Sequence, residues 1–450
     1  MAYVMDSPLN TTPVDDSPVP LKVRLRRAER MKKLKYGALI LPLVVFLFLT
    51  FLWPIASLLK RSVDNPEVAD GLPLTSAALK GWDGRALPSD KVFEALAADL
   101  VAGKGTPELA GAAKRLNMEE PGYRSLIMNS ARKLSATEAS EEGGSDFTGA
   151  GAGSVTAAVP APAVQASAAS ARERLIEADP RWGEVATWAP IARNASRYTA
   201  HYLLAATDHT IGPDGAVEAA PADEAIYLDV LGRTFWMSLV VTLWCLALGY
   251  PLAYFLATQP AKTSNLLMIL VLLPFWTSIL VRVAAWIVLL QSEGLVNQAL
   301  MLTGITSEPV QLVFNRVGVY IAMVHILLPF MILPLYSVMK GISPSYMRAA
   351  ISLGCPPFKS FRKVYFPQTL PGVGAGALLV FILSMGYYIT PALLGSPKEQ
   401  MASYFVAFYT NETINWGMAA ALSAILLVAT LVLYVAYTRL VGQSQPLKTK

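Results

Sequence analysis

Charged side chains are scarce in this 450-residue sequence. Aspartate, glutamate, lysine and arginine make up 15% of the residues, whereas a soluble domain usually has about a quarter. The scarcity is uneven, because residues 60–231 hold 40 charged residues and residues 1–36 hold 12, which leaves 17 for the other 242 positions. This division excludes a single soluble domain and predicts a membrane protein with one large aqueous insert.

Residues for several kinds of chemistry are also few. The two cysteines, Cys245 and Cys355, fit neither a metal cluster nor a disulfide framework, and the three histidines form no catalytic set with the scattered acids. The phosphate-binding pattern G-x-x-x-x-G-K-[ST] does not occur. We therefore expect no enzyme activity, no metal and no cofactor. The basic residues lie in short clusters beside apolar stretches, which indicates membrane topology and not nucleic-acid binding.

Six segments have the roughly 20 apolar residues that a spanning helix needs. Five contain no Asp, Glu, Lys or Arg, and the third contains Arg282. The first follows a polar tail and has no clear cleavage site, so we read it as an uncleaved anchor. The predicted spans are 37–59, 234–258, 266–291, 318–339, 373–395 and 417–437. The predicted fold is all-α, with six transmembrane helices.

Lysine and arginine in the short loops predict the orientation. Seventeen lie in the N-terminal tail, the 259–265 and 340–371 loops and the C-terminal tail, against two (Arg316 and Lys398) in the opposite loops. Both termini are therefore expected in the cytoplasm, with residues 60–231 outside it. The expected domains are a basic tail (1–36), a first span (37–59), a periplasmic insert (60–231), a five-helix core (232–441) and a cytoplasmic tail (442–450).

The insert is predicted to be mainly helical. Residues 90–117 have helical spacing with a glycine-rich break at 103–105, and an aromatic-bearing helical pattern runs over 172–206. Between them, residues 143–171 are rich in Gly, Ala, Ser and Pro and nearly free of charge, which predicts a mobile linker. Two interpretations of the insert stay open: a helical cap on the membrane domain, or a docking surface for an external partner.

The 340–371 loop has the most specific pattern. Ser343 suits a helix N-cap, Pro344 the first helical position and Gly354 the stop, so we expect a helix of about ten residues, too short to cross the membrane. Ala349 and Ala350 would let another chain approach closely. After it, Phe358, Phe361 and Tyr365 recur at helical spacing, which predicts a segment along the membrane surface that Pro367 and Pro371 end.

This loop resembles the cytoplasmic "EAA" loop of permease subunits in binding-protein-dependent type I ABC importers. The pattern is present as Arg348-Ala349-Ala350-x-x-x-Gly354, followed by Phe366-Pro367 and Pro371-Gly372, with Arg348 where the family has Glu. Further motifs at 248–253, 273–277, 326–331 and 334–336 resemble the spermidine/putrescine permease subfamily, over about 230–440. The long insert has no counterpart in that resemblance.

The resemblance implies a function and partners. In that family the short helix couples the spans to an ATP-binding subunit, so Arg348, Ala349, Ala350, Gly354, Pro367, Pro371 and Gly372 are the implied coupling residues. The implied assembly comprises a dimer of ATP-binding subunits, a second permease subunit, a periplasmic solute-binding protein and the lipid bilayer. The implied location is the inner membrane of a bacterium, with the insert in the periplasm. The implied substrate is a polyamine such as putrescine or spermidine; an opine, an amino-phosphonate or an amino acid derivative stays open.

Polar residues, and residues beside prolines that interrupt a helix, are candidates for the translocation path within the spans. Trp276, Thr277 and Ser278 follow Pro274, and Tyr387, Tyr388 and Thr390 precede Pro391; both prolines interrupt backbone hydrogen bonds. Arg282 is the one arginine well inside a predicted span, and burial of its charge requires a partner or water. For the aromatics, stacking on an organic cation and interfacial packing are equally good interpretations. For Arg282, binding to helix-end carbonyls or to a partner subunit is favoured over contact with a cationic substrate.

Two other classes of protein fit less well. An ion-coupled secondary transporter usually has acids or histidines within its spans, and no Asp or Glu lies in the predicted spans. A membrane sensor needs a cytoplasmic output domain, for which about a dozen C-terminal residues are too short.

Overall fold

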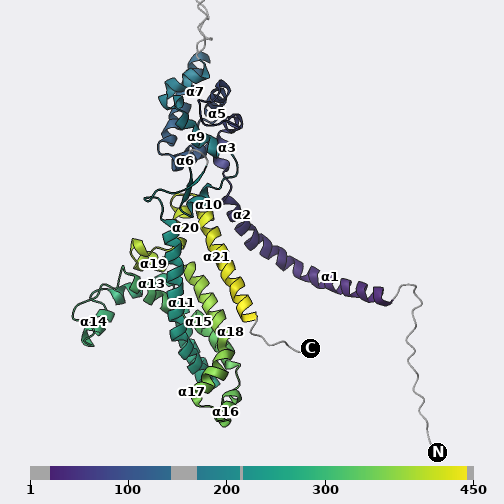
Figure 1. Ribbon diagram of the computed structural model, residues 1–450, viewed down its shortest axis with the longest axis vertical. Coiled ribbons are helices and arrows are strands. Elements are labelled where there is room, and N and C mark those ends of the chain that lie inside the picture. The colour runs from purple at the N-terminus through teal and green to yellow at the C-terminus, as the bar shows by residue number, and fades with distance from the viewer. Residues whose placement is uncertain (1–20, 143–169, 213–215, 443–450) are drawn as a thin grey trace, which may run out of the picture. The chain divides into compact units, whose positions relative to one another are not determined.

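The structure is a computed structural model that describes residues 21–142, 170–212 and 216–442. The chain divides into two compact units, Met1–Leu58 and Leu59–Lys450. The described part of the first unit is helical: α1 (Leu21–Leu47), a π-helical turn (Phe48–Leu52) and the start of α2 (Trp53–Arg61) (Figure 1). Its apolar side chains are exposed; the exposed fraction of Leu39, for example, is 80%. Such exposure suits a helix surrounded by lipid.

The insert between the first and second spans is a helical domain, as predicted. Proline opens three of its helices, where its missing N–H costs no hydrogen bond. The predicted glycine break lies between α5 and α6, with Gly105 at φ 78°. The helices are α3 (Pro66–Gly71), α4 (Pro73–Ala78), α5 (Asp90–Ala102), α6 (Pro107–Glu119), α7 (Tyr123–Glu142), α8 (Ala171–Ala178), α9 (Val185–Asn194) and α10 (His201–Ala205).

Aromatic residues form the centre of the insert. Trp182 and Trp188 are fully buried, and the Trp188 ring lies 4.7 Å from that of Phe93 at 63°. Each indole N–H has an acceptor, since Trp182 Nε1 donates to Ser130 Oγ at 2.9 Å and Trp188 Nε1 donates to the Trp182 carbonyl at 3.1 Å. The insert therefore has its own hydrophobic core, with its buried polar groups paired at these positions.

Two details of the insert differ from the sequence predictions. Most of the predicted 143–171 linker lies outside the described residues, but Ser170 is the N-cap and Ala171 the first residue of α8. Ser170 caps this helix in a reciprocal pair of hydrogen bonds with Glu173. A short antiparallel hairpin of β1 (His209–Ile211) and β2 (Val217–Ala219) follows α10, with Thr210 opposite Glu218. Three-residue strands are too short for an alternating pattern to reveal.

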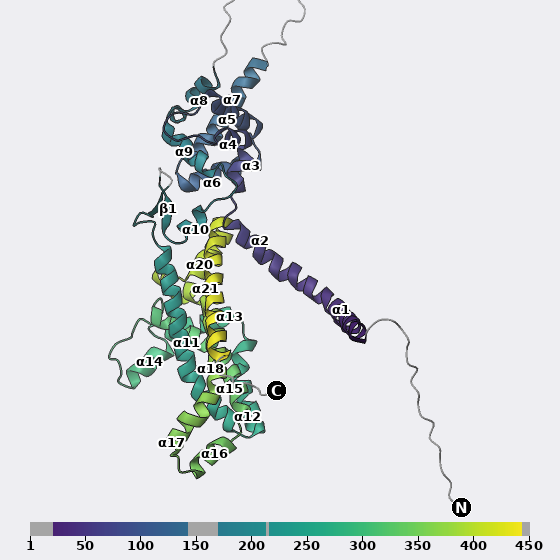
Figure 2. The same ribbon diagram turned by 45° about the vertical axis from the view of Figure 1, so that its right-hand side comes forward.

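The membrane part contains α11 (Tyr227–Thr258), α12 (Ala261–Leu272), α13 (Ile279–Leu290), α14 (Leu295–Leu302) and α15 (Arg316–Lys340), followed by the short α16 (Ser345–Ser352) and α17 (Pro357–Ser360). It ends with α18 (Phe366–Met385), α19 (Ile389–Leu394), α20 (Ala402–Asn411) and α21 (Trp416–Gly442). Helices α11, α15 and α18 lie side by side (Figures 1 and 2). Glycine permits this close approach, because a Cβ at Gly249 would lie 3.0 Å from Met331 Cγ.

Six helices in the described part of the chain are long and apolar enough to cross a membrane. They are Glu29–Arg61, Tyr227–Thr258, Ile279–Leu302, Arg316–Lys340, Pro357–Met385 and Trp416–Arg439. The predicted count of spans is therefore confirmed, but two differ in shape. The predicted third span, 266–291, is two helices separated by a 3₁₀ turn, Leu273–Trp276, at Pro274. The fifth helix begins at Pro357 and stops at Met385, and so is shifted from the predicted 373–395.

The insert is joined to the N-terminal end of the last span. Lys114 Nζ donates to the Thr413 carbonyl at 2.9 Å. The guanidinium of Arg61 lies 5.8 Å from the centre of the Trp416 ring. Tyr202 packs against Gly417, where a Cβ would come within 2.4 Å of the Tyr202 ring. These contacts match the helical-cap interpretation of the insert; docking of an external partner is not tested by them.

Candidate coupling loop and translocation path

The short helix predicted in the loop is present as α16, Ser345–Ser352, two residues shorter than expected. Gly354 ends it in the left-handed region at φ 86°. The Cys355 N–H bonds to the Ala350 carbonyl at 3.1 Å and the Gly354 N–H to the Ile351 carbonyl at 2.9 Å. This is the paired hydrogen-bond pattern of a glycine-terminated helix, so the stop follows from Gly354 as predicted.

The two alanines of the motif have different surroundings. Ala349 is exposed, whereas Ala350 is half-buried on the same side as Met347, which packs against the membrane core. Arg348 is exposed and has no ion pair in the described part of the chain. Ala349 is therefore the small residue available for close approach by another chain, and Ala350 faces this chain's own helices.

Pro367, Pro371 and Gly372 lie in the first turns of α18 and not on α16. The expectation that Pro367 and Pro371 end a surface helix is wrong, because one helical run continues from Pro357 to Met385. A π-helical turn, Phe361–Tyr365, precedes α18. The Phe361 and Tyr365 rings lie 5.6 Å and 5.3 Å from that of Tyr254, so packing on α11 overrides the helix-breaking tendency of proline.

Gly372 has a packing role. A Cβ there would lie 3.0 Å from Val338 Cβ and 3.2 Å from the Pro334 carbonyl oxygen. Gly372 therefore lets α18 approach α15 closely near Val338, just before the chain enters the loop that carries α16.

The candidates of the third span lie at its break. Trp276 is 75% exposed, and Thr277 and Ser278 are exposed beside it. Thr277 Oγ1 donates to the Pro274 carbonyl at 2.8 Å, which satisfies one carbonyl at the break. Ser278 is the first residue before α13, and its carbonyl accepts from the Arg282 N–H at 3.1 Å. The chain therefore presents an aromatic ring and two hydroxyls where the helix is interrupted.

Arg282 lies in the first turn of α13, directly after this break. Its Nε is buried without a hydrogen-bond acceptor in the described part of the chain. The structure therefore pairs the Nε of Arg282 with none of the other candidate residues of the path that it describes.

The fifth span is also interrupted, between Met385 and Ile389. Tyr387 and Tyr388 lie in the gap, where the Tyr387 carbonyl accepts from Ser403 Oγ at 2.7 Å. Tyr388 lines a cavity of about 400 Å³ together with Ser403, Thr410 and Asn411. Thr390 is fully buried, and its Oγ1 has no hydrogen-bond partner among the described residues. The break therefore places neutral hydrogen-bonding groups beside one aromatic ring.

Sequence reasoning missed a second cavity, of about 600 Å³. Trp244 of α11, Trp286 of α13 and Tyr320 of α15 line it, together with His325. Trp286 Nε1 donates to His325 Nδ1 at 3.2 Å. No local motif could reveal this cavity, since it is assembled from three helices far apart in the sequence.

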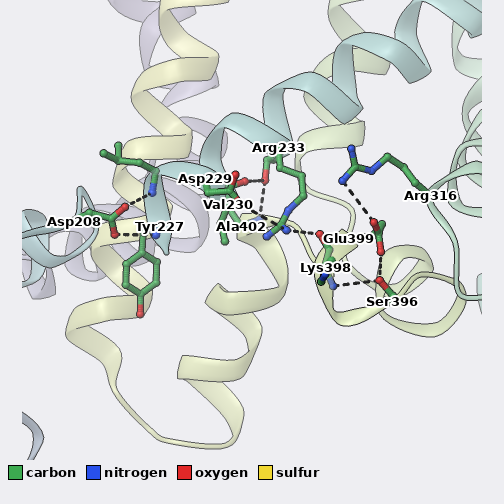
Figure 3. Close-up of polar contacts among 12 residues, drawn as sticks. Asp208, Tyr227, Asp229, Val230, Arg233, Arg316, Ser396, Lys398, Glu399 and Ala402 are labelled. Atoms are coloured by element: carbon green, nitrogen blue, oxygen red, sulfur yellow. Dashed lines mark hydrogen bonds and ion pairs between the residues drawn. The ribbon is translucent and has the colours of Figure 1, made fainter. Parts of the chain in front are cut away.

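Polar contacts join the N-terminal ends of α11 and α15 to neighbouring segments (Figure 3). Both carboxylate oxygens of Asp208 accept from the first turn of α11, at 2.8 Å from the Tyr227 N–H and 2.8 Å from the Leu228 N–H. Arg233 forms an ion pair with Asp229 at 3.7 Å and donates to the Lys398 carbonyl.

A parallel set of contacts reaches the segment before α20. Arg316, at the start of α15, lies 3.5 Å from Glu399, which also accepts from Ser396 (Figure 3). Thr234 Oγ1 accepts from the Ala402 N–H at 2.8 Å. The N-terminal ends of α11 and α15 and the 396–402 segment are therefore held as one group.

Comparison with known proteins identifies the family. The model of the family "Binding-protein-dependent transport system inner membrane component" matches residues 249–446 and leaves out the insert. The spermidine/putrescine transport system permease protein PotB of Escherichia coli is 34% identical over 216 residues, which are 48% of this chain and 78% of that protein.

Two more relatives agree. PotB of Haemophilus influenzae is 36% identical over 48% of this chain and 75% of its own length. The inner membrane ABC transporter permease protein YdcU of E. coli is 31% identical over 48% of this chain and 72% of its own length. The chain therefore belongs to the inner-membrane permease subunits of binding-protein-dependent type I ABC importers, in the subfamily that contains the spermidine/putrescine permeases.

Proposed function

We propose that this permease subunit imports a polyamine such as spermidine or putrescine. The observation that carries the proposal is the 34% identity to a spermidine/putrescine permease over 78% of that relative. The aromatic rings at the two breaks support it, because an organic cation binds favourably over an aromatic face. Arg282 would repel such a cation, so we assign it a structural role and not contact with the substrate.

The proposed assembly contains a second permease subunit, two ATP-binding subunits and a periplasmic binding protein. ATP hydrolysis belongs to the ATP-binding subunits, and this chain has no catalytic role of its own. Movement of α16 with the ATP-binding subunits would open the path alternately to each side of the membrane. The exposed Ala349, the stop at Gly354 and the position of α16 between two spans support this coupling role.

Uptake of radiolabelled spermidine and putrescine tests the substrate. Cells that have lost this gene should lose uptake, and the gene on a plasmid should restore it. Excess unlabelled opine, amino-phosphonate and amino acid serve as competitors. Absence of gene-dependent uptake of both polyamines, together with gene-dependent uptake of a labelled form of one of these compounds, would replace the polyamine. Uptake that follows the proton gradient and survives loss of cellular ATP would favour a secondary transporter instead.

The proposed orientation places both termini in the cytoplasm and the insert in the periplasm. The 17-to-2 distribution of basic residues between the loops of the two sides supports it. Lys104 is exposed on the insert, so Lys104→Cys in a chain without Cys245 and Cys355 gives one accessible thiol. A membrane-impermeant thiol reagent should label this variant on intact spheroplasts. Labelling only after lysis would place the insert in the cytoplasm and contradict the proposed orientation.

A further inference from the structure

The exposed face of α16 is centred on small side chains. Successive residues of a helix are about 100° apart. Met347 and Ala350 are half-buried on the side that faces the membrane core, so the opposite face is centred on Ser345, Ala349 and Ser352, all exposed.

The two edges of this face differ in chemistry. Arg348 lies on one edge, with Ile351, 43% exposed, beside it. Tyr346, 54% exposed, and Leu353, 89% exposed, lie on the other. A partner that covers this face meets a cation only on the Arg348 side, and a larger apolar surface on the side of Tyr346 and Leu353.

The charge of Arg348 is uncompensated within this chain. Residues 340–371 contain five basic residues and no Asp or Glu, and Arg348 has no ion pair in the described part of the chain. Covering a guanidinium with protein costs desolvation free energy unless a carboxylate pairs with it. The planar guanidinium and a carboxylate can form two parallel hydrogen bonds, which a lysine cannot reproduce.

We propose that the groove of the ATP-binding subunit that receives α16 is two-sided, with a carboxylate opposite Arg348 and an apolar pocket for Tyr346 and Leu353. The proposal rests on the coupling role proposed above. It specifies the chemistry of the partner that this chain, with Arg in place of Glu, can accept.

A protein groove fits this face better than a lipid surface. Lys340 Nζ donates to the Ala257 and Gln259 carbonyls at 3.3 Å and 3.1 Å, so the ends of α11 and α15 lie together there. Helix α16 lies beyond these ends, at one tip of its unit in both views (Figures 1 and 2). The small residues in the middle of its exposed face admit a close protein backbone, whereas a lipid-facing helix gains from large apolar side chains at that place.

Co-purification at increasing salt concentrations tests the charge. The affinity-tagged chain is extracted from its native membranes, and the recovered ATP-binding subunit is quantified. Arg348→Gln should lower recovery roughly tenfold at low salt and flatten its salt dependence, and Arg348→Glu should lower it further. Arg348→Lys should fall between wild type and Arg348→Gln. Arg439→Gln, which removes an exposed charge near the end of α21, is the matched control and should match wild type.

A photo-crosslinker in place of Arg348 identifies what lies opposite. The expected product is a peptide of the ATP-binding subunit that contains Asp or Glu. Cross-linking to lipid, or to a peptide without acid, would overturn the proposal, as would unchanged recovery in both Arg348→Gln and Arg348→Glu. If the wild-type chain recovers no ATP-binding subunit at any salt concentration, the coupling role itself is wrong. That outcome differs from recovery that is the same in wild type and in the Arg348 variants, which would overturn only the carboxylate opposite Arg348.

Discussion

The ring of Tyr202 lies directly on the backbone of Gly417, so that a Cβ at Gly417 would be 2.4 Å from Cε2 and 2.4 Å from Cζ of the ring. The same ring also packs against Arg115, whose guanidinium lies 5.1 Å from the centre of the ring. Tyr202 thus joins the core-facing side of the insert to the first turn of the last span. An aromatic ring can lie this close to a helix only where the helix has a glycine.

Gly417→Ala should separate the insert from the last span. The methyl group cannot fit beneath the Tyr202 ring, and displacement of the ring should lower the free energy of unfolding by about 1–3 kcal/mol. Disulfide formation between Lys114→Cys and Thr413→Cys, in a chain without other cysteines, reports the contact and should decrease.

Gly111→Ala is the control for this substitution, because a Cβ at Gly111 meets nothing within 4 Å. Disulfide formation in this variant should equal that of the parent. Equal disulfide yield in Gly417→Ala and Gly111→Ala would contradict the assigned contact.

Asp208→Ala should destabilise the start of α11. Asp208 has φ 56° and accepts two backbone N–H groups, so alanine loses both acceptors and is strained in the left-handed region. We expect a loss of about 1–2 kcal/mol, the usual cost of removing a helix cap. Asp208→Asn keeps one acceptor and tolerates this backbone, so its midpoint of thermal unfolding in detergent should lie between those of Asp208→Ala and wild type. The reverse order of the two variants would exclude a capping role.

His201 should make the protein less stable in mild acid. Burial, and secondly the charge of Arg115, lower the pKa of His201 from 6.5 to about 4. Between these values the unfolded chain binds a proton that the folded chain does not, so stability is complete above pH 6.5 and falls as the pH falls towards 4. By pH 5 the loss should be about 2 kcal/mol.

The pH effect is measured as thermal unfolding at pH 7.5 and pH 5. His201→Gln should show a smaller difference between the two conditions than wild type, because all other titrating groups are shared. The same difference in both proteins would show that His201 does not titrate in this range.

Gly354→Asp and Ala349→Trp should uncouple the permease from its ATP-binding subunits. Asp at Gly354 strains the helix stop by about 1–2 kcal/mol, and Trp at Ala349 adds bulk in the middle of the exposed face of α16. Both variants should insert normally but lose uptake and binding-protein-stimulated ATP hydrolysis. Gly304→Asp is the control: Gly304 also has positive φ, 72°, and open space around it, but lies in the loop between α14 and α15. Equal uptake in all three variants would remove α16 from the coupling mechanism.

The sequence predicted features with a local cause. Apolar length predicts the six spans, and Gly354 predicts the end of α16, because backbone conformation there depends on one residue. Pro367 and Pro371 misled the prediction, since rings 5.3–5.6 Å from Tyr254 hold the chain helical through that region. Ala350 was predicted to face a partner, and only the packing of Met347 shows which side of α16 is covered.

Non-local features could not be predicted. Asp208 caps a helix that begins 19 residues later in the chain, and no capping motif extends over that separation. The cavity lined by Trp244, Trp286 and Tyr320 requires knowledge of how three helices pack. These sites depend on tertiary structure and not on the pattern of one segment.

The larger part of the insert, from Asp64 to Tyr198, begins and ends at a single point. Asp64 and Tyr198 form a β-bridge, with the Asn65 N–H bonded to the Arg197 carbonyl at 2.8 Å and the Thr199 N–H bonded to the Val63 carbonyl at 2.9 Å. The 133 residues between Asp64 and Tyr198 therefore leave and re-enter the chain side by side. An evolving permease can acquire, exchange or discard such a module without rerouting its spans, since the closure entropy of a loop grows only slowly with its length.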